Sequence, residues 1–201
     1  MPRLSFSKAS LHKESARLKR YQQYLPSLDL KRQRLIIERY KAGKKQADTE
    51  LLIGQCRNNI AENLPMLSDT NIDLSNLVTI AAVKVGIENI VGIHIPVLEH
   101  IDMQSRPYST YTKPHWVDFA VVQLKSMLEL KIQLQIDKRR LEILEQAVKK
   151  ITQRVNLFDK VLIPRAQKNI KKIHIFLSDA ERASVVRAKI TKQKRQKKGL
   201  V

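Results

Sequence analysis

The chain has 201 residues, 43% of them hydrophobic, which is enough for one or two ordinary domains with a buried core. It contains only five glycines and ten aromatic residues, which argues against a many-stranded sandwich or barrel and favours long helices. A formal net charge of +19 predicts an acidic partner surface, and nucleic acid is one such partner.

Residues 1–69 are expected to form one coiled-coil helix, because apolar residues recur at heptad spacing. The first column is Leu11, Leu18 and Leu25, and it resumes at Ile53, Ile60 and Leu67. The second column is Leu28, Leu35, Ala42, Thr49 and Cys56. The two columns together form the seam, the stripe of heptad positions along which paired helices meet. Polar residues interrupt this seam at Arg32, Arg39 and Gln46, and they leave a groove that is either filled with water or covered by another protein chain.

Two prolines mark this segment. The apolar phase continues across Pro26, which predicts a kinked helix, and a short break between two helices is the alternative. Pro65 is expected to end the helix shortly before residue 69. The first twenty residues lack the apolar region of a signal peptide, and no run of eighteen apolar residues occurs anywhere, so no direct membrane insertion is expected.

The middle segment, residues 70–116, has a different pattern. Apolar residues alternate with other types around Val83, Val85 and Ile87, and again around Ile93, Ile95 and Val97. A period of two with β-branched residues predicts a short β-hairpin followed by a loop.

Residues 117–201 are expected to form the second coiled-coil helix with a basic tail. The helical pattern itself is expected to start slightly earlier, at Thr112 or Lys113, because Pro114 suits a first helical turn. Its seam alternates steps of three and four residues. The members are Leu141, Leu144, Val148, Ile151, Val155, Phe158, Leu162, Ala166, Ile170, Ile173, Leu177 and Ala180.

The seam departs from the heptad at one place, where Phe158, Leu162, Ala166 and Ile170 follow one another in consecutive steps of four. Such stutters locally unwind a supercoil. Pro164 lies inside this run, so we expect its kink to be tolerated where the supercoil is already relaxed.

Two long helical arms of similar length, joined by the middle segment, predict a mainly α fold. In this fold the N- and C-terminal helices form a long antiparallel two-helix coiled coil, with a short β-hairpin between them. A parallel dimer of extended helices is the alternative.

Charge is concentrated in the two arms. Residues 1–69 carry 14 basic and 7 acidic side chains, residues 70–116 carry 3 and 4, and residues 117–201 carry 21 and 8. No acidic residue follows Glu181, and the end of the chain is a candidate partner-binding segment. Its basic residues are Arg187, Lys189, Lys192, Lys194, Arg195, Lys197 and Lys198. A solvated, frayed helix end and a nucleic-acid contact are the competing interpretations.

Signals for catalysis are weak. Gly43-Lys44 is followed by Lys45 and does not complete a phosphate-binding loop. His94, His100 and His115 have no recognised metal-ligand spacing, so exposed or locally bonded histidines are expected. Cys56, the single cysteine, permits no internal disulfide, and we expect it to be a small buried hydrophobic residue. No catalytic, cofactor-binding or metal-binding residue is assigned.

The block "RVNLFDKVLIPRAQKNIKKIHIFLSDAERA" resembles the signature of the D subunits of V-type (archaeal and bacterial V/A-type) ATP synthases. The residues that match are Arg154, Val155, Asn156, Ile163, Pro164 and Arg165. The stretch "ENIVGIHIP", residues 88–96, is similar to the middle segment of that family.

This resemblance implies a rotor shaft with no catalytic site of its own and no cofactor. The partners it implies are a hexamer of alternating catalytic A and B subunits, the small F subunit, and a docking protein above the membrane ring. It implies a location in the cytoplasm, peripheral to the inner face of the cell membrane, and coupling of ATP synthesis or hydrolysis to proton or sodium transport. A basic helical hairpin that binds nucleic acid is the alternative function, and charge alone supports it.

Overall fold

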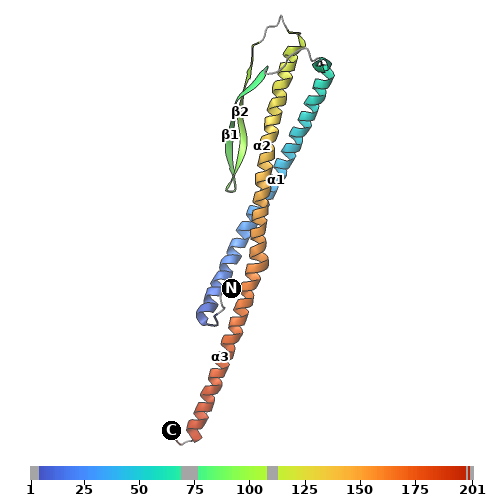
Figure 1. Ribbon diagram of the computed structural model, residues 1–201. Helices are drawn as coiled ribbons and strands as arrows, with labels where there is room; N and C mark the ends of the chain where they lie inside the picture. The colour runs from blue at the N-terminus through green and yellow to red at the C-terminus, as the bar shows by residue number, and fades with distance from the viewer. Residues whose placement is uncertain (1–4, 69–76, 108–112, 198, 200–201) are drawn as a thin grey trace. The chain divides into compact units, whose positions relative to one another are not determined.

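A computed structural model describes residues 5–68, 77–107, 113–197 and 199 (Figure 1). The elements, in chain order, are helix α1 (Lys8–Asn63), a 3₁₀ turn η1 (Pro65–Ser68), strands β1 (Val78–Ile90) and β2 (Ile93–Ser105), helix α2 (Trp116–Leu157), a π-helical turn η2 (Phe158–Leu162) and helix α3 (Ile163–Lys197). The predicted fold class is confirmed: the chain is mainly helical, with long N- and C-terminal helices and one antiparallel β-hairpin between them.

The contacts divide the chain into two compact units, and each contains parts of both helical arms. Unit 1 comprises residues 1–30 and 151–201, and unit 2 comprises residues 31–150.

In unit 1 the start of α1 lies antiparallel to α3. Three contacts follow one another in opposite directions along the two helices. Lys8 Nζ lies 3.4 Å from Glu181 Oε1, Asn169 Nδ2 donates to Glu14 Oε2 at 3.3 Å, and the rings of Tyr21 and Phe158 meet edge to face with centroids 5.5 Å apart. A further ring contact joins Phe6 to Phe176, with centroids 5.0 Å apart.

In unit 2 the remainder of α1 pairs with α2, also antiparallel. Thr49 contacts Asp137, and farther along α1 the Cys56 thiol lies 3.8 Å from Gln123 Oε1. The start of α2 closes a small apolar cluster with the residue before β1. This cluster contains Leu77, Val117 and Val121, with Val78 and Trp116 packed against it.

The β-hairpin lies beside α2 in unit 2 (Figure 1). Ile95 is completely buried, and Arg140 on α2 donates to Glu88 Oε2 on β1 at 3.0 Å. The strand register skips Ala81 on β1 and Glu99 on β2, so each strand carries one bulged residue. A Cβ atom at position 86 would meet the end of the Glu99 side chain, but this side chain is exposed and can move aside, so the contact alone does not require glycine there.

The two strands are joined by Val91 and Gly92, which both have positive φ values, 53° and 80°. Such a turn matches the twist of the strands but suits Asn-Gly much better than a β-branched residue. The Asn89 side chain accepts a hydrogen bond of 2.8 Å from Gly92 N–H and supports the turn.

Replacing Val91 with Asn is therefore expected to raise the free energy of unfolding by about 1 kcal/mol, because Asn tolerates positive φ. The measurement is urea-induced unfolding of the two proteins. Gly92→Ala is the opposing control and should lower stability, and a Val91→Asn protein less stable than the parent would contradict this account of the turn.

The structure corrects two details. α1 is helical through Pro26, so the alternative of two helices separated by a break is wrong. Pro26 is exposed, so the carbonyl group that loses its helical donor can face solvent.

The second arm begins at Trp116 rather than at Thr112 or Lys113, because Pro114 forms a turn in which its carbonyl accepts from Val117 N–H at 3.0 Å. Thr112 itself lies outside the described residues.

Candidate partner-binding surface

The C-terminal seam faces the paired side of its helices. Leu144, Ile151, Val155, Ala166 and Ile173 are buried. Six others are half-buried: Leu141, Val148, Phe158, Leu162, Ile170 and Leu177. Ala180 is exposed, so the paired part of α3 ends close to the ion pair between Lys8 and Glu181.

The π-helical turn η2 accounts for the irregular spacing around Pro164. From Phe158 to Ile170 there are twelve residues, where alternating steps of three and four would give eleven. The structure takes up this one extra residue in η2, where Ile163 N–H bonds to the carbonyl of Phe158, five residues back. Local unwinding of the supercoil, the expected explanation, is therefore not needed. The wider turn also gives the Pro164 ring room where an α-helical carbonyl would obstruct it.

The six residues of the family-like motif flank this turn on both sides. Val155 is buried and Arg154 and Asn156 are exposed immediately before η2. Ile163 and Pro164 are half-buried and Arg165 is exposed immediately after it. The motif therefore surrounds the place where the helix changes its winding.

Packing along α3 can be tested with two isoleucines two residues apart. Ile173 is 0% exposed and Ile175 is 53% exposed. Ile173→Ala should cost about 2–5 kcal/mol of unfolding free energy, because a buried side chain leaves a cavity, whereas Ile175→Ala should change it by less than about 0.5 kcal/mol. Thermal and urea unfolding would measure both, and equal losses would contradict the observed orientation of α3.

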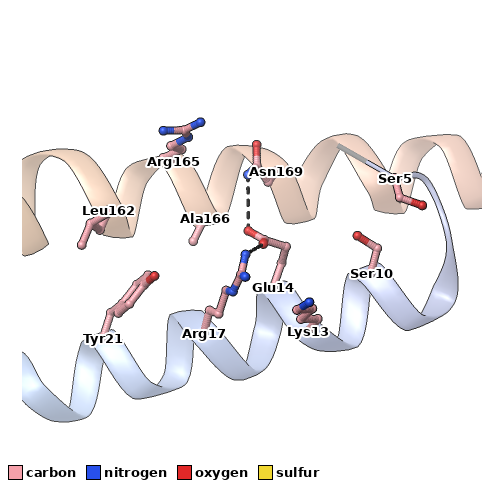
Figure 2. Close-up of a pocket in the computed structure, with 10 residues that line it drawn as sticks. All are labelled: Ser5, Ser10, Lys13, Glu14, Arg17, Tyr21, Leu162, Arg165, Ala166 and Asn169. Carbon is pink, nitrogen blue, oxygen red and sulfur yellow. Dashed lines mark hydrogen bonds and ion pairs between the residues drawn. The ribbon is translucent and has the colours of Figure 1, made fainter. Parts of the chain in front are cut away.

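A polar cluster interrupts the seam of unit 1 (Figure 2). Glu14 is only 8% exposed; its carboxylate accepts a 2.6 Å bond from Arg17 Nη1 and the bond from Asn169 across the helix pair. Beside it lies a cavity of about 430 Å³. Its lining comprises Ser5, Ser10, Lys13, Glu14, Arg17, Tyr21, Leu162, Arg165, Ala166 and Asn169.

Beyond the last contact with α1, α3 continues as a single helix. Every residue from Glu181 to Lys197 is exposed. The surface of this segment, which we call the free helix end (residues 182–197), carries basic side chains together with exposed Val185, Val186 and Ile190. In Figure 1 it extends past the start of α1.

The structure places six of the seven candidate partner-binding residues on this free helix end. They are Arg187, Lys189, Lys192, Lys194, Arg195 and Lys197, and all are exposed. Lys198 lies outside the described residues. Arg182, near the start of the segment, lies 3.9 Å from Asp179.

Metal-binding side chains do not gather in the described part of the chain. Within residues 5–68, 77–107 and 113–197, no group of three or more His, Cys, Asp or Glu side chains could hold a metal ion. His100 Nε2 lies 2.8 Å from Asp102 Oδ1, and His94 and His115 are exposed. Cys56 is half-buried. None of the described helices is both long enough and apolar enough to cross a membrane.

Sequence reasoning missed the buried carboxylates of Glu14 and Asp137. Both lie on the seams: Glu14 is three residues after Leu11, and Asp137 is four residues before Leu141. An acidic residue at a seam position was therefore the available signal, but a search for apolar periodicity passes over it.

Comparison with known proteins adds evidence of a different kind. A family model for the D subunit of ATP synthases matches residues 10–193. The chain is 33% identical over 198 residues to the D subunit of the V-type ATP synthase of Borreliella burgdorferi, covering 98% of each chain. It is 32% identical to the corresponding subunits of Chlamydia felis, covering 97% of this chain and 95% of the relative, and of Chlamydia pneumoniae, covering 95% and 92%.

Proposed function

This chain belongs to the D-subunit family of V-type ATP synthases, and we propose that it is the central rotor shaft of such a complex. In this role it couples ATP synthesis or hydrolysis in a catalytic hexamer to proton or sodium transport through rotation. The chain contributes no catalytic group and no cofactor. It works in the cytoplasm, peripheral to the inner face of the cell membrane.

The observation that carries the proposal is the free helix end. It is a basic helix with exposed valine and isoleucine side chains, and no other described helix covers it, so it presents both charge and apolar surface to a partner. We propose that it enters the central cavity of the hexamer of A and B subunits. Attraction between its charges and acidic groups would centre the shaft without fixing one angular position.

The remaining partners are assigned to the middle segment. We propose that the segment containing β1 and β2 contacts the small F subunit and the docking protein above the membrane ring. The near-neutral charge of residues 70–116, with 3 basic and 4 acidic side chains, supports a different environment from that of the basic arms.

Co-purification with the A and B subunits of the same organism, with and without the F subunit, tests the proposal. One copy of this chain per hexamer, together with a rise in ATP turnover that depends on the chain, is the expected result. A chain that fails to bind the hexamer and instead binds DNA or RNA with steep salt dependence would overturn the proposal in favour of nucleic-acid binding.

A further inference from the structure

Two buried carboxylates lie on the helix seams, one in each unit. Glu14 is 8% exposed and lies on α1, whereas Asp137 is 2% exposed and lies on α2. A carboxylate at a seam position costs desolvation free energy unless it is bonded, so its partners determine which arrangement of the helices it tolerates.

Asp137 is bonded from its own helix and from the helix opposite. Gln133, one turn earlier on α2, donates to Asp137 Oδ2 at 3.0 Å. From α1, Thr49 Oγ1 lies 3.3 Å from the same oxygen and shares its single proton between Asp137 and the Lys45 carbonyl, which is 2.9 Å away. Lys45 Nζ lies 3.5 Å from Oδ1. The bond from Gln133 persists however the helices slide, so Thr49 and Lys45 are the partners that depend on register.

An apolar heptad seam alone discriminates poorly against sliding by seven residues, because one leucine replaces another. The polar positions respond differently. A slip of one heptad would place Ala42 or Cys56 opposite Asp137 in place of Thr49, and would replace Lys45 with Glu38 or Leu52. Neither slipped register restores the polar contacts that Asp137 has in the structure.

In unit 1, a slip of one heptad would likewise remove the polar partner of Glu14 on the opposite helix. Its partner across the seam is Asn169, and the residues seven positions from Asn169 are Leu162 and Phe176. Arg17 stays with Glu14 in every register because both residues are on α1. In both units, therefore, each one-heptad slip exchanges a polar partner for an apolar or repelling one.

We propose that the Asp137–Thr49–Lys45 and Glu14–Asn169 clusters are register locks, which restrict each helix pair to a single antiparallel alignment. This inference goes beyond the proposed function and does not depend on it, because it concerns only pairing within the chain. A buried polar residue has this effect in other coiled coils, where it fixes alignment at a cost in stability.

The single cysteine of the chain makes the alignment measurable in unit 2. Cys56 lies beside Gln123, so Gln123→Cys creates a pair that reports the native register. Leu134→Cys, eleven residues along α2, reports the slipped register in which Cys56 comes opposite Asp137. Leu130 is unsuitable, because the native contact between Thr49 and Asp137 already places it opposite Cys56. Each variant contains only two cysteines, so an intramolecular disulfide formed by mild oxidation of dilute protein identifies one alignment.

The test adds Asp137→Leu with Thr49→Val to each reporter. With the native cluster, the pair 56–123 should form and the pair 56–134 should not. With the apolar seam, we expect the 56–134 disulfide to increase by about ten-fold and the 56–123 disulfide to fall, in a protein that remains helical. A slip in the other direction would also lower the 56–123 yield.

The matched control is the exposed ion pair next to the cluster, Glu50 and Lys138, whose charged atoms are 3.9 Å apart. Glu50→Gln with Lys138→Gln should leave both disulfide yields unchanged. Asp137→Asn keeps an acceptor for Thr49 and should retain the native register. If the double variant does not fold, Thr49→Val alone replaces it, with an expected increase of about three-fold in the slipped pair. Unchanged yields in a folded variant would overturn the proposal.

Discussion

Replacing four basic residues of the free helix end with Gln is expected to weaken binding to the hexamer of A and B subunits by about 100-fold at low ionic strength. The four residues are Lys192, Lys194, Arg195 and Lys197, all exposed and with no acidic residue after Glu181. The loss should shrink as salt is raised, because the Debye length falls to about 3 Å at 1 M. Binding measured at two or more salt concentrations checks this expectation.

The matched control removes the same number of charges from the paired part of unit 1. Its residues are Lys19, Lys168, Lys171 and Lys172, all exposed. If total charge alone governed binding, the two variants would bind the hexamer of A and B subunits with equally reduced affinity. An equal loss in both variants, or a loss of affinity in the first variant that stays the same at every salt concentration, would contradict the role given to the free helix end.

Deleting Val161 together with Pro164→Ala is expected to leave a folded chain whose second arm is one continuous α-helix. The reason is that η2 accommodates one residue beyond the heptad count, so its removal keeps Ala166 and Ile173 on the seam. The unfolding free energy should stay within about 1 kcal/mol of the parent. Deleting Val161 while keeping Pro164 should cost about 3 kcal/mol, because the proline would then lie inside a regular α-helix.

Deleting Lys150 is the control of equal length. Each residue of an α-helix turns by about 100°, so this deletion rotates the buried Ile151 and Val155 away from the seam. A loss of at least about 4 kcal/mol is expected from two large buried side chains. Urea unfolding of the three deletion proteins gives the comparison. Similar stability for the Lys150 and Val161 deletions would mean that η2 does not absorb the extra residue.

Most of the fold could be predicted from the spacing of apolar residues, because buried positions recur at regular intervals along each helix and strand. The seam from Leu141 to Leu177 was visible in the sequence since every member falls on one helical face. The same logic located the hairpin but underestimated its strands, which extend to Val78 and Ser105. The bulged residues Ala81 and Glu99 interrupt the alternation, so the period of two is clear only near the turn.

Two parts of the candidate site could not be predicted in the same way. The consecutive steps of four around Pro164 indicated an irregularity, but whether a helix absorbs an extra residue by unwinding or by a π-turn depends on its packing. The partners of Glu14 and Asp137 lie 155 and 88 residues away in sequence, on opposite helices. Their identity requires the register of the pair, which heptad spacing leaves ambiguous by multiples of seven.

The continuous helical path from Trp116 to Lys197 has a consequence for the free helix end. An isolated segment of about sixteen residues would be marginally helical in water, because the first turn fixes several dihedral angles for one hydrogen bond. Residues 182–197 avoid this nucleation step, since they extend a helix already formed and held by its pairing with α1. Each added residue only propagates the helix. A partner that covers this segment therefore meets a preformed surface, and less conformational entropy is lost on association.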